Sequence, residues 1–256
     1  MKMIVFDIWG DYGHFKKIYT TTSPLSYDFP PKTSIYGMLG AFLGLDKEDY
    51  LKHINKDTVK IALKIKNPIQ KTNIALNLID TKRDKIKKSN ISLDNKSIKS
   101  IKIYNVNLIP NRTQIRFEML KNPKYRLYVH LTDEKLYSKL KKLLEQHKTV
   151  YTISLGLSEL LANFEYMGEF EFEKKVSDDE YTTINSLIRR DNIINDDINL
   201  ELNKEYLFSK IPNEMDENRL TTEYIDIFYE RNGESINCKV KEYYHIPELK
   251  ENITLI

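Results

Sequence analysis

Cationic, hydroxyl and aromatic side chains are concentrated in one short segment, residues 16–27. They are Lys16 and Lys17, the hydroxyl residues Thr20, Thr21, Thr22, Ser23 and Ser26, and the rings of Tyr19 and Tyr27. Lysines and hydroxyls hydrogen-bond to phosphate oxygens, and tyrosine rings stack on bases. The mixture is suited to contact with a nucleic-acid backbone. A Ser/Thr-rich loop that leads into a helix is the structural alternative.

The same segment contains groups for metal-free RNA cleavage. Such cleavage needs a base for the ribose 2′-hydroxyl, an acid for the leaving oxygen and a cation on the phosphate. His14, Lys16 and Tyr19 are the candidates for these roles. The sequence has no Walker loop, no His-Glu-x-x-His motif and no Cys-x-x-Cys pair. We therefore expect no metal and no cofactor.

Charge is distributed unevenly, although the formal net charge is only +3. Residues 60–126 contain 17 Lys and Arg against 4 Asp and Glu, whereas residues 165–256 contain 11 against 22. Segregation of this size favours one face for a polyanion and another for a different partner. A solvated charged surface is the alternative explanation.

Length and composition restrict the class of protein. With 256 residues, 41% of them hydrophobic, the chain can bury a core in one large domain or in a domain with an appendage. The single cysteine, Cys238, excludes an internal disulfide. No apolar stretch reaches the roughly 18 residues of a membrane span, and we find no signal peptide. We expect a soluble, cytoplasmic protein that does not bind a membrane.

Several elements would position the residues between 14 and 32. An apolar strand is expected at residues 3–8, and a helix at residues 32–42 after Pro30 and Pro31. A second short helix is expected to begin at Asp46 as its N-cap. Gly37, Gly40, Ala41 and Gly44 give the first helix a small-residue face, which fits either a close packing contact or an RNA backbone.

The rest of the chain shows strand patterns at residues 59–65 and 125–131, a helix capped by Thr132, and a return strand near residues 168–172. Ser158 is expected to cap a further apolar helix, with an anion site at its start. Residues 68–122 are an insertion that we expect to form a basic β-hairpin arm, flexible around residues 80–100. Asn232 and Gly233 predict a hairpin that joins strands at residues 224–229 and 236–240.

This order of elements predicts an α+β fold, a ferredoxin-like βαββαβ domain with a long inserted basic hairpin and a β-rich C-terminal extension. We assign residues 1–172 to the ferredoxin-like domain, with residues 68–122 as the inserted hairpin, or thumb. Residues 173–256 form the acidic C-terminal part.

Three stretches together resemble the CRISPR-associated Cas-five family. The first comprises residues 9–17 (WGDYGHFKK), 19–27 (YTTTSPLSY) and 29–44 (FPPKTSIYGMLGAFLG). The others are residues 111–120, with NRTQI and EML, and residues 151–164 (YTISLGLSELLANF). The resemblance covers most of the first 170 residues in the right order, and it is closest to the form found in type I-B effector complexes.

The resemblance implies a RAMP-type subunit of a type I Cascade complex that grips the 5′ handle of CRISPR RNA and caps the filament of backbone subunits. It implies CRISPR RNA, the backbone RAMP subunits and the large subunit as partners, with target DNA as a further partner within the complex. Members that cleave RNA carry a Lys-His dipeptide that this chain matches only at Lys52 and His53, in a predicted surface helix. The resemblance therefore favours binding over catalysis. The alternatives are a metal-independent endoribonuclease that processes precursor RNA, and a pure assembly protein.

Carried over by matched position, the candidate RNA contacts come from three segments. They are His14, Lys16, Lys17, Tyr19, Thr20, Thr21, Ser23, Ser26, Tyr27 and Lys32 in the first, Arg112, Thr113, Gln114 and Arg116 in the second, and Gly156 and Ser158 in the third. Among them, Arg112 and Arg116 can each donate paired hydrogen bonds to a phosphate, and Gln114 can hydrogen-bond to a base edge.

Overall fold

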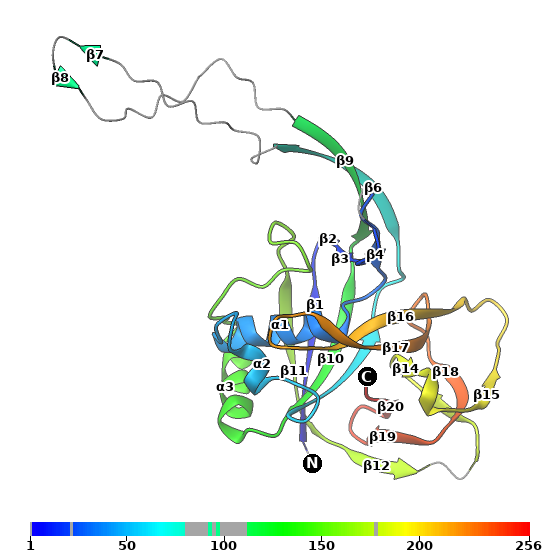
Figure 1. The fold of residues 1–256 in the computed structure, drawn as a ribbon. Helices are drawn as coiled ribbons and strands as arrows, with labels where there is room; N and C mark the ends of the chain where they lie inside the picture. Colours follow the sequence, from blue (N-terminus) through cyan, green and yellow to red (C-terminus); the bar gives the residue numbers. More distant parts are fainter. Residues whose placement is uncertain (1, 21–22, 80–91, 94–95, 98–111, 177–178) are drawn as a thin grey trace.

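The computed structural model of the chain describes residues 2–20, 23–79, 92–93, 96–97, 112–176 and 179–256. Figure 1 shows a body built of sheets and helices, from which a two-stranded arm rises. Among the described helices, none combines the length and the apolar composition that a membrane crossing requires.

A four-stranded antiparallel sheet forms the centre of the body. Its strands are β1 (Lys2–Trp9), β5 (Val59–Ile65), β10 (Lys124–Leu131) and β11 (Asn163–Glu171), in the order β11-β1-β10-β5. The connection from β1 to β5 contains α1 (Lys32–Leu43), and that from β10 to β11 contains α3 (Glu134–Glu145). The strand, helix and strand order predicted from the sequence is therefore present, although β11 begins earlier than expected.

Both faces of this sheet are covered. On one face Ile4, Phe6 and Ile8 of β1 belong to the main hydrophobic cluster, which also includes the buried side chains of α1 and α3. On the other face Met3 and Val5 belong to a second cluster, with side chains from the last part of the chain. Because both faces are buried, the strand is apolar at nearly every position instead of alternating.

The helices begin and end at local signals, two of which differ from the prediction. α1 ends at Gly44, whose φ of +68° is the left-handed conformation that favours glycine. α2 (Tyr50–His53) is shorter than predicted and begins after Asp49, because the Asp46 carbonyl closes a turn by accepting from the Tyr50 N–H at 2.9 Å. α3 is capped by Asp133, not by Thr132.

The arm is an antiparallel ladder of β6 (Lys71–Ile79) with β9 (Arg112–Lys121). At its base β2 (Tyr12–Gly13) pairs with β9, and β3 (Phe15–Lys16) pairs with β4 (Ser26–Tyr27). A short pair, β7 (Ser92–Leu93) with β8 (Lys96–Ser97), also belongs to the insertion. Most of the tip that we predicted to be flexible, residues 80–100, lies outside the described residues.

The C-terminal part is rich in β-structure, as predicted, and forms three small sheets. Its elements are β12 (Glu173–Val176), β13 (Thr182–Ile184), β14 (Ile188–Arg189), a 3-10 turn (Arg190–Asn192), β15 (Ile193–Asn199), β16 (Tyr206–Met215), β17 (Thr221–Glu230), β18 (Ile236–Val240), β19 (Glu242–Ile246) and β20 (Glu251–Ile253). The sheet orders are β12-β19-β20, β13-β18-β15 and β14-β17-β16.

The hairpin predicted at Asn232 and Gly233 is wrong. The turn exists, with Gly233 at φ +80°, but β17 pairs with β14 and β16 while β18 pairs with β13 and β15. The Glu230 carboxylate accepts from the Asn232 and Glu234 N–H groups at 2.7 and 2.9 Å and so redirects the chain. Gly233 lies against β5, where a Cβ atom would be 2.2 Å from the Ile65 carbonyl oxygen.

The hydrophobic clusters continue across residue 172. Ile211 and Ile227 of β16 and β17 belong to the same cluster as Ile35 and Leu39 of α1. The second cluster joins the outer face of the central sheet to Tyr244, Ile246 and Ile253 of β19 and β20. The acidic part therefore shares its core with the first part, and the division into two domains stays a prediction.

Lys32, which the resemblance places among the RNA contacts, lies inside this shared region. It is 5% exposed, and its ammonium lies 3.4 Å from the Glu214 carboxylate of β16. The Tyr36 hydroxyl donates to the same carboxylate at 2.7 Å. Burial lowers the pKa of Lys32, and the charge of Glu214 opposes that shift. Lys32 therefore holds α1 to β16 in this structure and is not available at the surface.

We predict that Lys32→Met lowers the free energy of unfolding by about 3–5 kcal/mol, because it leaves the buried Glu214 carboxylate without its cation. The double variant Lys32→Met/Glu214→Gln should regain most of that loss, since glutamine still accepts the Tyr36 hydrogen bond. Urea unfolding followed by circular dichroism measures both. A double variant as unstable as the single one would contradict this role for the ion pair.

Candidate nucleic-acid interface

Two of the three predicted segments meet at the base of the arm. The β3–β4 hairpin lies against β9, where the Glu118 N–H donates to the Pro24 carbonyl at 3.0 Å. The Glu118 carboxylate accepts in turn from the Ser26 N–H at 3.0 Å. Lys16 pairs with Ser26 across the hairpin, and Arg116 lies two residues from Glu118 on the same face of β9. The tertiary structure thus brings the hairpin that carries Lys16 next to the strand that carries Arg116.

Six of the predicted contacts are exposed in this region. They are Lys16, Tyr19, Ser23, Thr113, Gln114 and Arg116, and Lys17 is partly exposed beside them. Tyr19 is 72% exposed, which leaves its ring free for stacking. The arrangement can offer cations to phosphates, an amide to a base edge and a ring to a base. Thr21 and the side chain of Arg112 lie outside the described part of the chain.

His14 has a different environment from the one that catalysis needs. It is 1% exposed, its Nδ1 lies 2.8 Å from the Glu118 carbonyl oxygen, and its ring packs on Phe117 with centroids 5.3 Å apart. Its Nε2 has no hydrogen-bond partner in the described structure. A base that removes a proton from a ribose hydroxyl must come within hydrogen-bond distance of it. Buried in this way, His14 joins β2 to β9 and does not face solvent.

Three other predicted contacts form the hairpin itself. Ser26 is fully buried and its Oγ accepts from the Phe15 N–H at 2.9 Å. The Thr20 hydroxyl donates to the Lys17 carbonyl at 2.8 Å. Tyr27 is 3% exposed, and burial raises its pKa to about 12. Their polar atoms therefore shape the loop that presents Lys16 and Tyr19.

The helix predicted to begin at Ser158 is wrong. Residues 155–160 form a turn, which the Leu155 N–H closes by donating to the Leu160 carbonyl at 2.8 Å. Ser158 is exposed and donates to Glu159 at 3.2 Å, so there is no helix N-terminus here to bind an anion. Gly156 has φ +102°, and a Cβ atom there would be 1.8 Å from the His14 carbonyl oxygen. Tight packing of the turn against His14 explains why glycine is needed.

Several basic residues that the charge count assigned to a polyanion surface are used inside the body. Lys71 forms ion pairs with Asp28 at 2.6 Å and with Glu118 at 3.0 Å. Arg126 pairs with Asp7 at 2.6 Å, in the middle of the central sheet. The acidic residues concerned, Asp7, Asp28 and Glu118, lie outside the C-terminal acidic stretch and were too scattered in the sequence to suggest these pairs.

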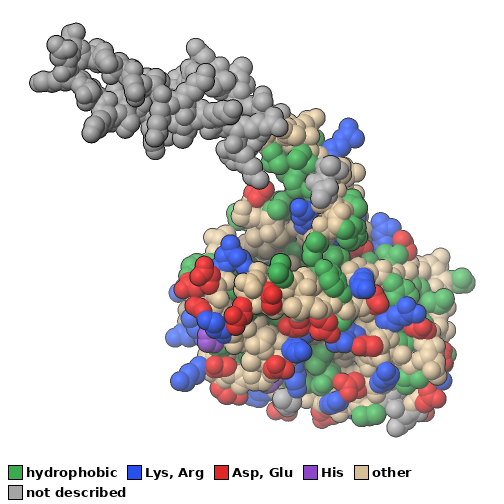
Figure 2. Space-filling model, in the orientation of Figure 1, with side chains coloured by type: hydrophobic (Ala, Val, Ile, Leu, Met, Phe, Trp, Pro, Cys, Tyr) green, Lys and Arg blue, Asp and Glu red, His purple; other side chains and the backbone are tan. Residues whose placement is uncertain are grey.

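The surface charge also differs from a simple division into two faces. Figure 2 shows Lys and Arg interspersed with Asp and Glu on the visible face of the body. Eight of the 17 Lys and Arg of residues 60–126 fall on residues 80–111, most of which lie outside the described part. Within the described residues, no group of three or more His, Cys, Asp or Glu lies close enough together to hold a metal ion.

Comparison with known protein families gives one decisive result. The family model described as CRISPR-associated protein (Cas_Cas5) matches residues 3–226, most of the chain. The chain belongs to the CRISPR-associated Cas5 family. The match includes the arm and most of the C-terminal strands, whereas the resemblance noted in the sequence covered only the first 170 residues. Comparison with curated protein sequences gives no match.

Solved structures show the same fold at low sequence identity. A CRISPR protein from Archaeoglobus fulgidus superposes with a TM-score of 0.56 and 14% identity, over 99% of this chain and 98% of that one. A chain from a CRISPR RNA-guided surveillance complex superposes with a TM-score of 0.52 and 8% identity, over 92% and 91% of the two chains. Coverage this complete shows that this Cas5 chain has the same overall arrangement as both.

We predict that Gly156→Ala destabilises this Cas5 chain by about 2 kcal/mol or more, because the new Cβ atom must displace the His14 backbone and φ is positive. Thermal unfolding measures the loss. Gly37→Ala is the matched control: a Cβ atom at Gly37 meets nothing within 4 Å, and alanine should stabilise α1 by up to about 1 kcal/mol. Equal melting temperatures for the two variants would refute this account of Gly156.

Proposed function

We propose that this chain is a non-catalytic subunit of a type I CRISPR surveillance complex that binds the 5′ handle of the guide RNA. The observation that carries the proposal is the packing of the β3–β4 hairpin, with exposed Lys16, against β9, with exposed Gln114 and Arg116, although about 100 residues separate the two segments in sequence. Family membership supports it, and so does the fold shared with a chain from an RNA-guided surveillance complex.

The chemistry of these side chains suits single-stranded RNA. Arg116 can donate two parallel hydrogen bonds to a phosphate, and Lys16 supplies a second cation. Gln114 has both a donor and an acceptor for a base edge, and Tyr19 offers a ring. Cations position the RNA backbone, whereas Gln114 and Tyr19 would provide any preference for the handle sequence.

The arm supports the proposed contacts with other subunits. On one face of the ladder Ile74 lies opposite Phe117 and Leu76 opposite Ile115, and Leu78 is 41% exposed further along. This apolar strip suits a groove in a neighbouring backbone subunit, where the chain would cap the filament; the large subunit and target DNA would be further partners. The order β11-β1-β10-β5 with α1 and α3 supports the ferredoxin-like interpretation of the domain that carries the arm.

Burial of His14 supports binding over cleavage. The base that the nuclease hypothesis requires is 1% exposed and is held by Glu118. Lys16 and Tyr19, the other two candidates, are exposed on the hairpin, so the three side chains do not present a joint site to RNA.

We predict that Lys16→Ser/Arg116→Ser weakens binding of a repeat-derived RNA by roughly tenfold or more at 0.1 M salt, since each lost charged hydrogen bond contributes about 1.5 kcal/mol or more. The dependence of log K on log salt should also become shallower by about 0.7 for each lost phosphate contact. Fluorescence anisotropy at several salt concentrations measures both quantities.

Lys175→Ser is the control for that double variant, because Lys175 is exposed on β12, at the opposite end of the body from the arm in Figure 1. Its RNA affinity should equal that of the wild type. Unchanged affinity in the double variant would remove the base of the arm from the RNA site. Equal affinity of the wild type for repeat-derived and scrambled RNA would favour the pure assembly protein.

Incubation of the wild type with end-labelled repeat RNA in EDTA should leave the RNA intact. His14→Gln should behave identically in this assay, because a buried side chain that does not reach RNA cannot change its cleavage. A discrete product that appears with the wild type and disappears with His14→Gln would instead establish the endoribonuclease. Circular dichroism of the variant checks that its fold is kept.

A further inference from the structure

A cavity of about 490 Å³ opens on the outer side of α1, and its lining includes Gly37, Gly40 and Ala41 of the small-residue face. Four separate segments line it: α1, the loop before α2, the segment before β11 at Tyr151, and the turn between β16 and β17 at Arg219. Its volume lies within the range of small-molecule sites in proteins.

The floor of the cavity is exposed helix backbone. Gly37, Gly40 and Ala41 lie there, and a Cβ atom at Gly37 would meet nothing within 4 Å. Gly40 is covered by Tyr50, because a Cβ atom at Gly40 would lie only 3.3 Å from the Tyr50 Cβ. The small-residue face of α1 is therefore filled by packing at Gly40 and left open at Gly37.

The walls are held in place by hydrogen bonds from the surrounding segments. The Tyr151 N–H donates to the Ala41 carbonyl at 3.0 Å, and its hydroxyl donates to Asp46 at 3.2 Å. The Arg219 N–H donates to the Asp216 carbonyl at 2.8 Å and closes the β16–β17 turn, and the Tyr50 hydroxyl donates to the Met215 sulfur at 3.9 Å at the start of that turn. The site is thus built by contacts between distant parts of the chain.

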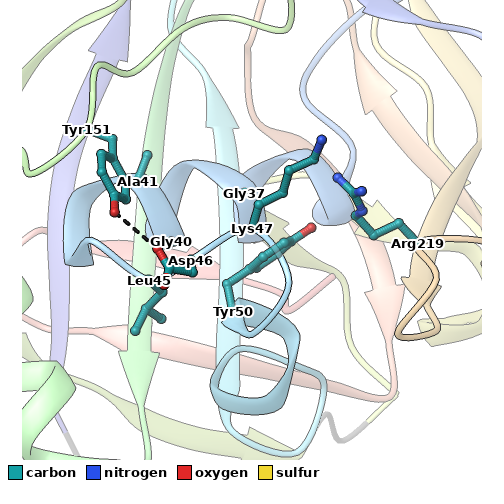
Figure 3. Close-up of a pocket in the computed structure, with 9 residues that line it drawn as sticks. All are labelled: Gly37, Gly40, Ala41, Leu45, Asp46, Lys47, Tyr50, Tyr151 and Arg219. Atoms are coloured by element: carbon teal, nitrogen blue, oxygen red, sulfur yellow. Dashed lines mark hydrogen bonds between the residues drawn. The ribbon is translucent and has the colours of Figure 1, made fainter.

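The two ends of the cavity differ in charge. Figure 3 shows Tyr151 and Asp46 together at one end, and Lys47, Arg219 and the Tyr50 hydroxyl near one another at the other. Lys47 and Arg219 are both exposed, and neither forms an ion pair with any described residue. The carbonyl end of α1 adds negative potential on the side of Asp46. A ligand with an anionic end and an N–H donor at the other end would match this polarity.

We propose that this cavity binds one nucleoside phosphate unit, with the phosphate on Lys47 and Arg219 and the base against Tyr50 and Tyr151. The free oxygen of Asp46 would accept a hydrogen bond from an N–H group of the base. The unit is either a free nucleotide or one nucleotide of an RNA chain. Binding of RNA here rests on the proposed function, whereas binding of a free nucleotide does not.

A nucleotide fits better than an acidic peptide. An acidic side chain would satisfy the cations, but it would leave the aromatic and glycine-lined part of the cavity unfilled. A base is flat, so it can lie against the exposed ring of Tyr151, over a helix that has no side chain at Gly37.

Amide chemical shifts of the full chain, titrated with the four nucleoside 5′-monophosphates, test the proposal. The chain has only eight glycines, so the signals of Gly37 and Gly40 can be assigned by single substitutions. At least one monophosphate should shift these signals saturably, and its nucleoside without phosphate should bind at least tenfold more weakly. The double variant Lys47→Ser/Arg219→Ser should bind the monophosphate roughly tenfold more weakly than the wild type does.

Two substitutions at one position separate blocking from unfolding. Gly37→Trp fills the cavity and should abolish the shifts at Gly40, whereas Gly37→Ala leaves room and should bind like the wild type. Lys52→Ser, on α2 but outside the lining, should also bind like the wild type. No saturable shift with any monophosphate, or equal binding by Gly37→Trp and Gly37→Ala, would overturn the proposal. The proposal would also be overturned if inorganic phosphate or a glutamate peptide shifted the same signals to the same extent as the monophosphates do.

The same Gly37→Trp variant identifies the source of the nucleotide. If the unit belongs to RNA, Gly37→Trp should reduce affinity for repeat RNA by about fivefold or more, and ultraviolet crosslinking of RNA to Tyr151 should disappear. If RNA affinity is unchanged while monophosphates still bind the wild type, the site takes a free nucleotide. The Lys16→Ser/Arg116→Ser variant tests RNA binding at the base of the arm separately. If that variant binds RNA like the wild type, the proposed function fails, whereas the cavity proposal fails only if no monophosphate binds at Gly37.

Discussion

The position of Lys71 between two carboxylates is the interaction on which the proposed interface depends. Its ammonium pairs with Asp28 and Glu118 and also donates to the Ser26 carbonyl at 3.1 Å. Burial by itself lowers the pKa of Lys71, but the hydrogen bonds and charges of the two carboxylates outweigh it and raise that pKa. The first residue of the arm is therefore fixed to the β3–β4 hairpin by an ammonium group that remains protonated.

Asp28 extends this network into the C-terminal part. It accepts from the Tyr229 hydroxyl of β17 at 2.5 Å, and its backbone carbonyl accepts from the Tyr125 hydroxyl of the central sheet at 2.9 Å. One loop thus connects the arm, the sheet and β17. Buried polar networks of this kind are costly unless every member is satisfied, and here each carboxylate has a cation or a hydroxyl. The hairpin that carries Lys16 and the strand that carries Arg116 are held together by a network that contains neither residue.

The C-terminal part has a structural role that its acidic composition hides. Its strands cover the outer face of the central sheet, and its β16 buries Lys32 through Glu214. Glu251 of β20 accepts from the Tyr128 hydroxyl and pairs with Lys64 at 2.6 Å. Some of the acidic excess is thus neutralised inside the body by basic residues of the first part. The two charge runs in the sequence partly compensate one another across the fold.

The sequence by itself determined the elements whose signals are local. The strand at Val59–Ile65, the helix that ends at Gly44 and the order of strands and helices follow from apolar periodicity and from the conformational freedom of glycine. The family resemblance was also readable, because its motifs are contiguous. Lys16 was a candidate because of its residue type, whereas Arg116 was a candidate through the family resemblance.

Only the tertiary structure decided which polar residues face solvent and which strands pair. His14, Ser26 and Lys32 have the residue types of an RNA site, but their hydrogen bonds and ion pairs are made inside the fold with Glu118, Phe15 and Glu214. The Asn232 and Gly233 turn was recognisable, yet its flanking strands pair elsewhere. Pairing and burial depend on partners far along the chain, because the free energy of folding is gained from packing and hydrogen bonding between distant segments. A local pattern does not contain that information.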